Sequence, residues 1–428
     1  MSPSSAQEDL LDALQKDGFK YFLEEVNPSN GLVADSTWEN GVSSIAAVGF
    51  ALACYPVGVE HGWMSRQDAV ERSLVTLRYF QSSPQGAEPG TTGYQGFYYH
   101  FLDLQTGQRS WNSELSTIDT TLLLYGMLTA AQYFEGDVPG ERELRGLSDQ
   151  LYRRVNWNWA QDDALTVRHG WLPESGFLGY RWQGYDEALL LYILGLGSPE
   201  HPLPKESYNA YTSSYRWDAL YGYEVLHAAP LFVHQFPQVW IDFRDVQDEP
   251  MRARGLDYFE NSRRATYVHQ QHAIQNPSGF EGYGEHAWGI TASEGPIQGT
   301  EPIERNGHTF YGYLARGVPG PDDGTLSPWT TVTALPFAAE IALPAIEYFH
   351  KTYPQLAGSY GLKCSLNPSF RENPETNAGW FSEHYYGINE GPVVLMIENY
   401  RSGLIWRLSG SSSYIQKGLK QAGFRGTE

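Results

Sequence analysis

The chain has 428 residues and a formal net charge of −21, which argues against nucleic acids and anionic membrane surfaces as partners. Hydrophobic residues make up 41% and charged residues only 18%, which excludes wholesale disorder. Aromatic residues make up 14%, and rings with polar edges suit the faces of sugars. A neutral carbohydrate is therefore the expected partner class.

Apolar residues at helical spacing predict a first helix over 7–26, and the same pattern recurs along the chain. The other predicted helices are 43–56, 66–82, 116–135, 141–156, 186–196, 219–231, 248–266, 336–353 and 391–407. Few segments predict strands.

Segments such as "TTLLLYGMLTAAQYF" are apolar on every face, whereas "GERELRGLSDQLYRRV" is apolar on one side only. Helices of the first kind belong to an inner layer and those of the second kind to an outer layer. We therefore expect an all-α fold, an (α/α)6 barrel, as a single domain over 1–428. An irregular helical array or an α-solenoid is the alternative, but no fixed-period repeat supports it.

The N-terminal segment lacks a basic stretch followed by an apolar run, and no run of about eighteen apolar residues occurs. We expect no membrane insertion and a soluble chain, cytoplasmic as written, or periplasmic or secreted if a leader was trimmed. Cys54 and Cys364 cannot form a disulfide framework. The sequence gives no indication of the oligomeric state.

Four long linkers combine Gly and Pro with Trp or Tyr and with carboxylates, at 90–115, 168–187, 276–296 and 377–392. Long ordered loops are typical of binding sites. Each linker leads toward a helix or a core segment. The linkers are therefore predicted to form one shared rim at the mouth of the barrel.

Asp186 and Glu187 lie where the apolar helix 186–196 is predicted to begin. Asp186 suits a helix cap. Glu187 lies beside the aromatic segment "YRWQGY", and apolar burial together with a neighbouring acid raises a carboxyl pKa. Glu187 is therefore a candidate general acid for a glycosidic oxygen.

Two further acids are candidates for the second catalytic carboxylate. Asp119 follows Ser116 at the spacing of a capping box and precedes an apolar helix, so catalysis, sugar binding and capping all remain open. Glu390 precedes the apolar segment that starts at Gly391. The sequence is equally compatible with three roles for Glu390: a general base, an acceptor for a sugar hydroxyl group, or a residue that only starts the helix.

Loop composition selects further candidates for sugar contacts. The candidates for stacking are Tyr94, Trp111, Trp182, Tyr185, Tyr283 and Trp288, and those for hydroxyl groups are Gln183, Glu285, His286 and Glu294. No zinc, calcium, phosphate-binding or dinucleotide motif is present, so we expect neither a metal nor a cofactor. Carboxylates, aromatic rings and neutral polar groups remain, as in glycoside hydrolysis.

The segments "STIDTTLLLYGMLTAAQYF", "YDEALLLYILGLGSP", "WGITASEGP" and "GINEGPVVLMIENYRSGLIW" resemble the bacterial glucoamylase-like family that contains the endo-β-1,2-glucanases. The resemblance extends from about Gly18 to Leu408. It implies an (α/α)6 barrel and hydrolysis of β-1,2-linked glucan with inversion. It also implies that Glu187, in the "YDEA" motif, is the general acid. The family has a further acid on an early helix, and Asp119 is the residue that matches it in this chain.

The chain departs from the family pattern at one motif. Relatives often read Asp-Gln-Gly-Pro where this chain has Asn389, Glu390, Gly391 and Pro392. An amide cannot take a proton as that Asp can, so Asn389 is expected only to bind substrate. Asp119, Glu390 or a relay along a substrate hydroxyl group are the remaining ways to activate water.

Other functions fit the same sequence features. An exo-acting enzyme or an α-glucan hydrolase of the glucoamylase type would share the fold, and a non-catalytic carbohydrate-binding protein would use the acids only as hydrogen-bond acceptors. A lyase for acidic polysaccharides is disfavoured because basic residues are few in the four linkers.

Overall fold

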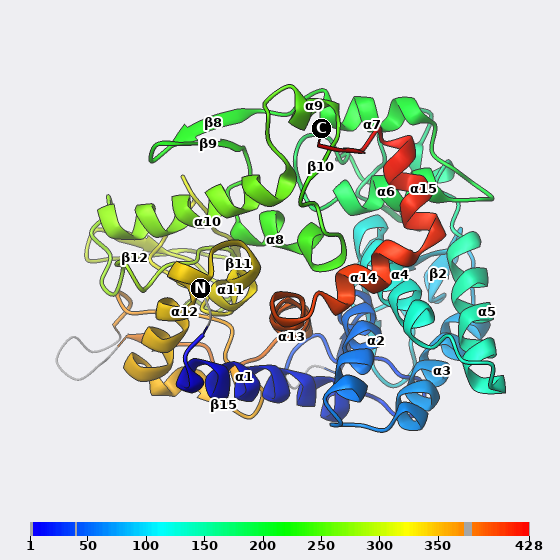
Figure 1. The fold of residues 1–428 in the computed structure, drawn as a ribbon, viewed down its shortest axis with the longest axis horizontal. Helices are drawn as coiled ribbons and strands as arrows, with labels where there is room; N and C mark the ends of the chain where they lie inside the picture. Colours follow the sequence, from blue (N-terminus) through cyan, green and yellow to red (C-terminus); the bar gives the residue numbers. More distant parts are fainter. Residues whose placement is uncertain (1–2, 39–40, 372–378, 428) are drawn as a thin grey trace.

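Helices dominate the computed structural model, which describes residues 3–38, 41–371 and 379–427 (Figure 1). The helices of the first half are α1 (Ser5–Glu24), α2 (Ile45–Glu60), α3 (Arg66–Ser82), α4 (Thr117–Tyr133), α5 (Pro139–Arg153), α6 (Leu189–Gly197) and α7 (Lys205–Thr212). Those of the second half are α8 (Leu231–Trp240), α9 (Glu249–Arg252), α10 (Tyr258–Gln275), α11 (Trp329–Thr333), α12 (Leu335–Thr352), α13 (Gly387–Arg401), α14 (Leu404–Ser411) and α15 (Ser413–Gln421).

The helices form two concentric layers. Nearly all residues of α2, α4, α6, α8, α11 and α13 are buried, and these helices form the inner layer. Outside them α1 packs on α13, α3 on α5, and α10 on α12, while α14 and α15 pack on α4 and α6. Figure 1 shows α13 near the centre, with α1, α3, α5, α10 and α12 around it. The predicted (α/α)6 barrel is confirmed.

Two glycines allow the inner helices α2 and α4 to approach closely. A Cβ atom on Gly126 would lie 2.0 Å from the carbonyl oxygen of Gly49, and one on Gly49 would lie 2.4 Å from that of Leu122. Neither position has room for a side chain in a close-packed interior. This contact brings together the segments that precede α2 and α4, where β1 pairs with β4.

The strands are numerous but very short. They are β1 (Val42–Ser44), β2 (Gly93–Tyr94), β3 (Phe97–Tyr99), β4 (Phe101–Asp103), β5 (Leu115–Ser116), β6 (Gly170–Leu172), β7 (Gly176–Phe177), β8 (Trp217–Leu220), β9 (Tyr223–Leu226), β10 (Val246–Gln247), β11 (Ala292–Ser293), β12 (Ile303–Arg305), β13 (His308–Phe310), β14 (Leu314–Ala315), β15 (Ala357–Gly358), β16 (Gly361–Leu362), β17 (Leu366–Asn367), β18 (Trp380–Phe381) and β19 (Arg425–Gly426). The largest sheet has the order β2-β3-β5-β6-β7 and is antiparallel. It joins the linkers 90–115 and 168–187 into one layer above the barrel.

The predicted helix 219–231 is wrong. The segment forms most of the hairpin β8–β9, whose turn has Tyr221 and Gly222 at φ 49° and 87°. Two consecutive residues with positive φ are the signature of a tight hairpin turn, and the helix starts only afterwards, at Leu231. The predicted helix 248–266 is interrupted at Gly255 (φ 64°), and Asp257 caps the second helix, α10.

Two boundaries matter for the site. The helix α6 starts at Leu189 rather than at 186, and α13 starts at Gly387 rather than at 391. Residues 377 and 378 of the linker 377–392 lie outside the described residues. Among the residues that the structure describes, no helix has the length and apolarity needed to cross a membrane.

Candidate active site

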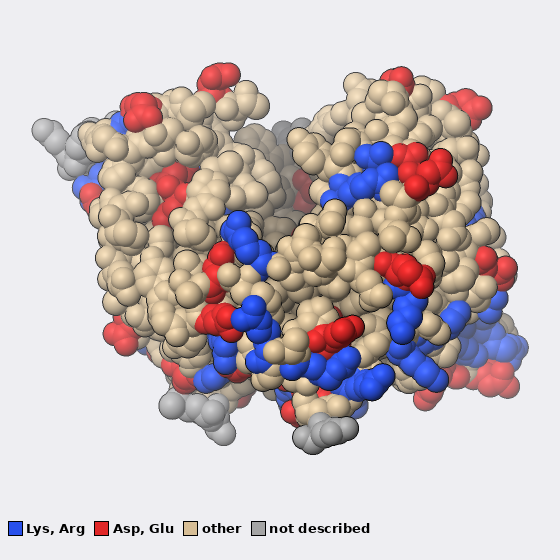
Figure 2. Space-filling model, turned by 90° about the horizontal axis from the view of Figure 1, so that it is seen from above, with Lys and Arg blue, Asp and Glu red and all other residues tan. Residues whose placement is uncertain are grey.

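A cavity of about 750 Å³ opens at the mouth of the barrel. Its lining comes from 35–38 and Ser44 before α2, 100–122 at the start of α4, 169–187 before α6 and 386–388 at the start of α13, with Phe232, Phe236 and Tyr313. Figure 2 shows a hollow in the upper outline of the molecule, between two raised parts of its surface. Three of the four predicted rim linkers contribute to the cavity, and 276–296 contributes no lining residue in the described part of the chain.

Glu187 lies in the turn that leads into α6 and lines the cavity. Its carbonyl accepts a hydrogen bond from the Leu190 N–H (3.2 Å), and Asp186 accepts one from the Ala188 N–H (3.0 Å). Burial raises the pKa of Glu187 to about 7; its own backbone N–H lowers the pKa, whereas the charge of Asp119 raises it. Glu187 can therefore carry a proton near neutral pH.

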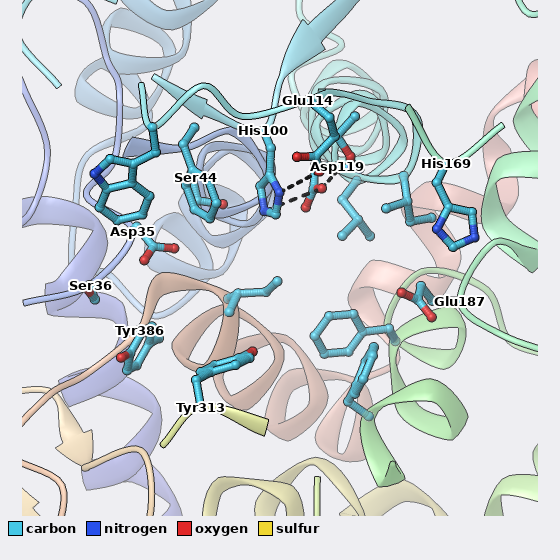
Figure 3. Close-up of a pocket in the computed structure, with 18 of the residues that line it drawn as sticks. Asp35, Ser36, Ser44, His100, Glu114, Asp119, His169, Glu187, Tyr313 and Tyr386 are labelled. Carbon is cyan, nitrogen blue, oxygen red and sulfur yellow. Dashed lines mark hydrogen bonds and ion pairs between the residues drawn. The ribbon is translucent and has the colours of Figure 1, made fainter. Parts of the chain in front are cut away.

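A pair of stacked rings forms the wall beside Glu187. Figure 3 shows His169 on the same side of the cavity as Glu187. The His169 ring stacks on Trp182 with centroids 3.7 Å apart, and the indole N–H of Trp182 donates to the Thr117 hydroxyl (2.9 Å). Burial lowers the pKa of His169, so this ring is neutral and adds no cation beside the acid.

Asp119 lies in the first turn of α4 and faces the cavity. Its backbone N–H donates to the Ser116 hydroxyl oxygen (3.1 Å), as the capping interpretation predicts, and that hydroxyl donates to Asp119 Oδ2 (2.5 Å). The His100 ring lies between two acids: its Nδ1 is 3.0 Å from Glu114 Oε1 and its Nε2 is 3.6 Å from Asp119 Oδ2 (Figure 3).

The His100 ring is a cation at neutral pH. Burial lowers its pKa, but the charge of Asp119, the hydrogen bond and charge of Glu114 and the charge of Asp35 outweigh burial and raise the pKa to about 9. One potential ligand atom from each of His100, Glu114 and Asp119 lies within 4.8 Å of the other two. Among the described residues, this is the group whose spacing would allow a metal ion to bind. Because Glu114 and Asp119 face opposite nitrogens of the His100 ring, these residues fit an ion-paired cluster better than a metal centre.

Asp35 is a cavity acid that sequence reasoning missed. It lies at the end of the cavity away from Glu187, near Ser36 and Tyr386 (Figure 3). Burial raises the pKa of Asp35 to about 6, His100 lowers it, and Asp119 raises it. Asp119 and Glu187 lie at the starts of α4 and α6, whereas Asp35 lies well before α2, which begins at Ile45, so local sequence gives no comparable signal for Asp35.

The predicted sugar contacts divide between the cavity and other places. Trp111 and Trp182 line it, and 59% of the Trp111 surface is exposed. Eight others do not line it: Tyr94, Gln183, Tyr185, Tyr283, Glu285, His286, Trp288 and Glu294. Glu294 still supports the rim, because its carboxylate accepts from the Ser382 hydroxyl (2.6 Å) and contacts His384 (3.2 Å). Lining residues that the prediction omitted include Asp35, Trp38, His100, His169, Tyr313 and Tyr386.

Glu390 and Asn389 point away from the cavity. Glu390 is 2% exposed and faces α1, where a Cβ atom on Gly18 would lie 3.1 Å from its Oε2. Burial raises the pKa of Glu390 well above its ordinary range, and the charge of Asp17 adds to this. The Asn389 amide lies 3.5 Å from Cys364 Sγ. The start of α13 reaches the cavity through Tyr386 and Ile388 instead.

The fold and sequence match a group of known proteins. A putative glucoamylase from Bacteroides uniformis is 29% identical, covers 99% of both chains and has a TM-score of 0.87. A β-1,2-glucanase from Parabacteroides distasonis is 25% identical, with 99% of this chain and 61% of that chain covered and a TM-score of 0.85.

A curated relative from Parabacteroides distasonis, an exo β-1,2-glucooligosaccharide sophorohydrolase (non-reducing end), is 26% identical over 97% of this chain. The chain spans 58% of the length of that relative. The Glycoamylase family model, which describes putative glucoamylases, matches residues 179–413. Since this match covers more than half of the chain, the protein belongs to the Glycoamylase family.

Proposed function

We propose that the protein is a glycoside hydrolase that cleaves β-1,2-linked glucan with inversion. The observation that carries the proposal is the presence of Glu187, with a pKa of about 7, in the same cavity as the carboxylate of Asp119. Two relatives bear names that refer to β-1,2-linked glucose, which supports this linkage over starch.

Glu187 acts as the general acid. A carboxyl group with a pKa near 7 is still partly protonated at neutral pH, so it can give its proton to the glycosidic oxygen as the bond breaks. The stacked rings of His169 and Trp182 beside Glu187 form a fixed surface against which the sugar packs.

Asp119 acts as the general base for water. It faces the cavity beside the His100 cation, whereas Glu390 faces α1 and Asn389 offers only an amide. Inversion requires space for a water molecule, so the Glu187 and Asp119 carboxyl groups are expected about 6.5–9.5 Å apart in the substrate complex. Water then attacks from the face opposite to the leaving group.

The test is product analysis after the purified protein is incubated with linear β-1,2-glucan, with soluble starch in parallel. We expect glucose-based oligosaccharides from the β-1,2-glucan alone, and loss of turnover in Glu187→Gln and Asp119→Asn. Proton NMR of the first products is expected to show the α-anomer, as inversion of a β-linkage requires. Release from starch alone, or equal turnover by Glu187→Gln, would contradict the proposal.

A further inference from the structure

A second cavity lies next to the active-site cavity. It has a volume of about 740 Å³, and residues that line it include Glu25, Thr37, Tyr360, Glu383 and His384. Trp38 lines both cavities. The proposed mechanism does not use the second cavity.

The wall between the two cavities is one layer of backbone. The segment before α2 pairs with the segment before α13: Ser36 forms an antiparallel bridge with Tyr386, and the Thr37 N–H donates to the Tyr385 carbonyl (3.0 Å). Successive side chains of an extended segment point to opposite sides. Accordingly Ser36 and Tyr386 line the active-site cavity, while Thr37 and Tyr385 line the second one.

Trp38 links the two cavities and is held in place from both sides. Its ring stacks on the His384 ring with centroids 3.8 Å apart, and its indole N–H donates to the Tyr386 hydroxyl (3.2 Å). His384 is held in turn by the Glu294 carboxylate (3.2 Å). Trp38 remains 40% exposed, so a fixed aromatic ring is available to a ligand that passes from one cavity to the other.

The second cavity is suited to a neutral ligand with many hydroxyl groups. The Tyr360 hydroxyl donates to Glu25 (2.7 Å), and Glu383 is exposed at its edge, paired with Lys363 (2.6 Å). Carboxylates that keep unused acceptor positions, together with aromatic rings, match sugar hydroxyl groups and sugar faces. The carboxylates disfavour an anionic ligand.

The position of the second cavity relative to Glu187 gives it a distinct role. Figure 3 shows Ser36 and Tyr386 at the end of the active-site cavity that is remote from Glu187. A glucan chain cleaved at Glu187 must therefore extend through the whole active-site cavity before it reaches Trp38. Only a longer chain can reach the second cavity.

We propose that the second cavity binds the continuation of the glucan chain, which crosses from one cavity to the other over Trp38. This inference rests on the proposed function, because it takes the same polymer as the ligand. It makes the protein a binder of long β-1,2-glucan chains in preference to short oligosaccharides.

The test measures the affinity of purified β-1,2-glucooligosaccharides of three to about ten units by calorimetry, in the Glu187→Gln background so that no ligand is consumed. Trp38→Ala removes the shared ring. Ser359→Trp places a large ring in the second cavity from an exposed position, so the fold is retained. Trp217→Ala, on β8 outside both cavities, is the matched control.

We expect affinity to increase with chain length and both cavity variants to weaken the longest ligand about tenfold. Because Ser359 lines only the second cavity, Ser359→Trp is expected to leave the affinity for the trisaccharide within about twofold. The control is expected to match the background at every length. Affinity that does not depend on length, or equal weakening at every length by Ser359→Trp, would overturn the inference. Absence of binding at every length would instead contradict the proposed function.

Discussion

Replacing Glu187 by Gln is expected to stabilise the fold in a manner that depends on pH. The folded protein holds this carboxyl at a pKa of about 7, mainly because the group is buried. In the unfolded chain the pKa of this carboxyl group is about 4.3. The folded state therefore binds a proton that the unfolded state releases between about pH 4 and pH 7.

The sign of the effect follows from this proton. Where the folded state binds more protons than the unfolded state, the free energy of unfolding decreases as pH rises. Glutamine resembles the protonated acid and has no such dependence. The stability gained by Glu187→Gln is therefore near zero below about pH 4 and complete above about pH 8.

The difference between the two pKa values corresponds to about 3–4 kcal/mol. Glu187 is partly open to the cavity, and its titration is linked to that of Asp186, whose pKa burial and the Glu187 charge raise well above its ordinary range. Screening by water in the cavity reduces the effect, so we expect a gain of about 1–3 kcal/mol at pH 8.

The assay is guanidinium unfolding of the wild type and of Glu187→Gln at pH 4.5, 6 and 8, with Glu301→Gln as a control at an exposed position. The control is expected to change the free energy of unfolding by less than about 0.5 kcal/mol at each pH. A gain that is constant with pH, or largest at pH 4.5, would refute the assignment of a raised pKa to Glu187.

Further predictions concern activity, packing and binding. Because Glu187 must be protonated to act, kcat/KM on β-1,2-glucan is expected to fall about tenfold per pH unit above pH 7, and a profile that is flat up to pH 9 contradicts this. Gly126→Ala is expected to destabilise the fold by about 2–3 kcal/mol because its Cβ atom would overlap Gly49, whereas Gly146→Ala on α5, with open space around it, is expected to be neutral or slightly stabilising; equal melting temperatures would argue against the close contact. Asp35→Asn is expected to raise KM about tenfold with little change in kcat, since it removes a charged acceptor at the end of the cavity remote from Glu187; steady-state kinetics checks this, and a large loss in kcat with unchanged KM would assign Asp35 to the chemical step. Dialysis against EDTA is expected to leave turnover unchanged, because the His100 cation pairs with acids instead of binding a metal, and activity restored only by added metal would refute this.

Local sequence was enough to predict three helices of the inner layer and two of the cavity acids. A helix that is apolar on every face can bury all of its apolar surface only in the inner layer of the barrel. The helices α2, α4 and α6 are therefore recognisable from composition alone. Asp119 and Glu187 lie where such helices begin, and the ends of the inner helices line the mouth. The hairpin β8–β9 was missed because its aromatic residues also fit helical spacing, and the turn at Tyr221 and Gly222 was not taken into account.

The direction of a side chain on a buried helix was not readable from the sequence. Glu390 and Glu187 look alike locally, since each acid lies next to an apolar helix. In the structure a Cβ atom on Gly391 would lie 2.4 Å from Phe50, so α13 presents its glycines to α2 and turns Glu390 toward α1. That rotation depends on a residue far away in sequence.

The sequence by itself determined the layered helical barrel and the acid before α6, because both follow from the polarity of neighbouring residues along one helix. Only the tertiary structure decided that His100 lies between Glu114 and Asp119, that Asp35 shares their cavity, and that Trp38 joins a second one. His100 and Glu114 belong to the segment before α4, whereas Asp35 and Trp38 come from the segment before α2. Their geometry is set by the packing of the whole barrel, which no single segment encodes.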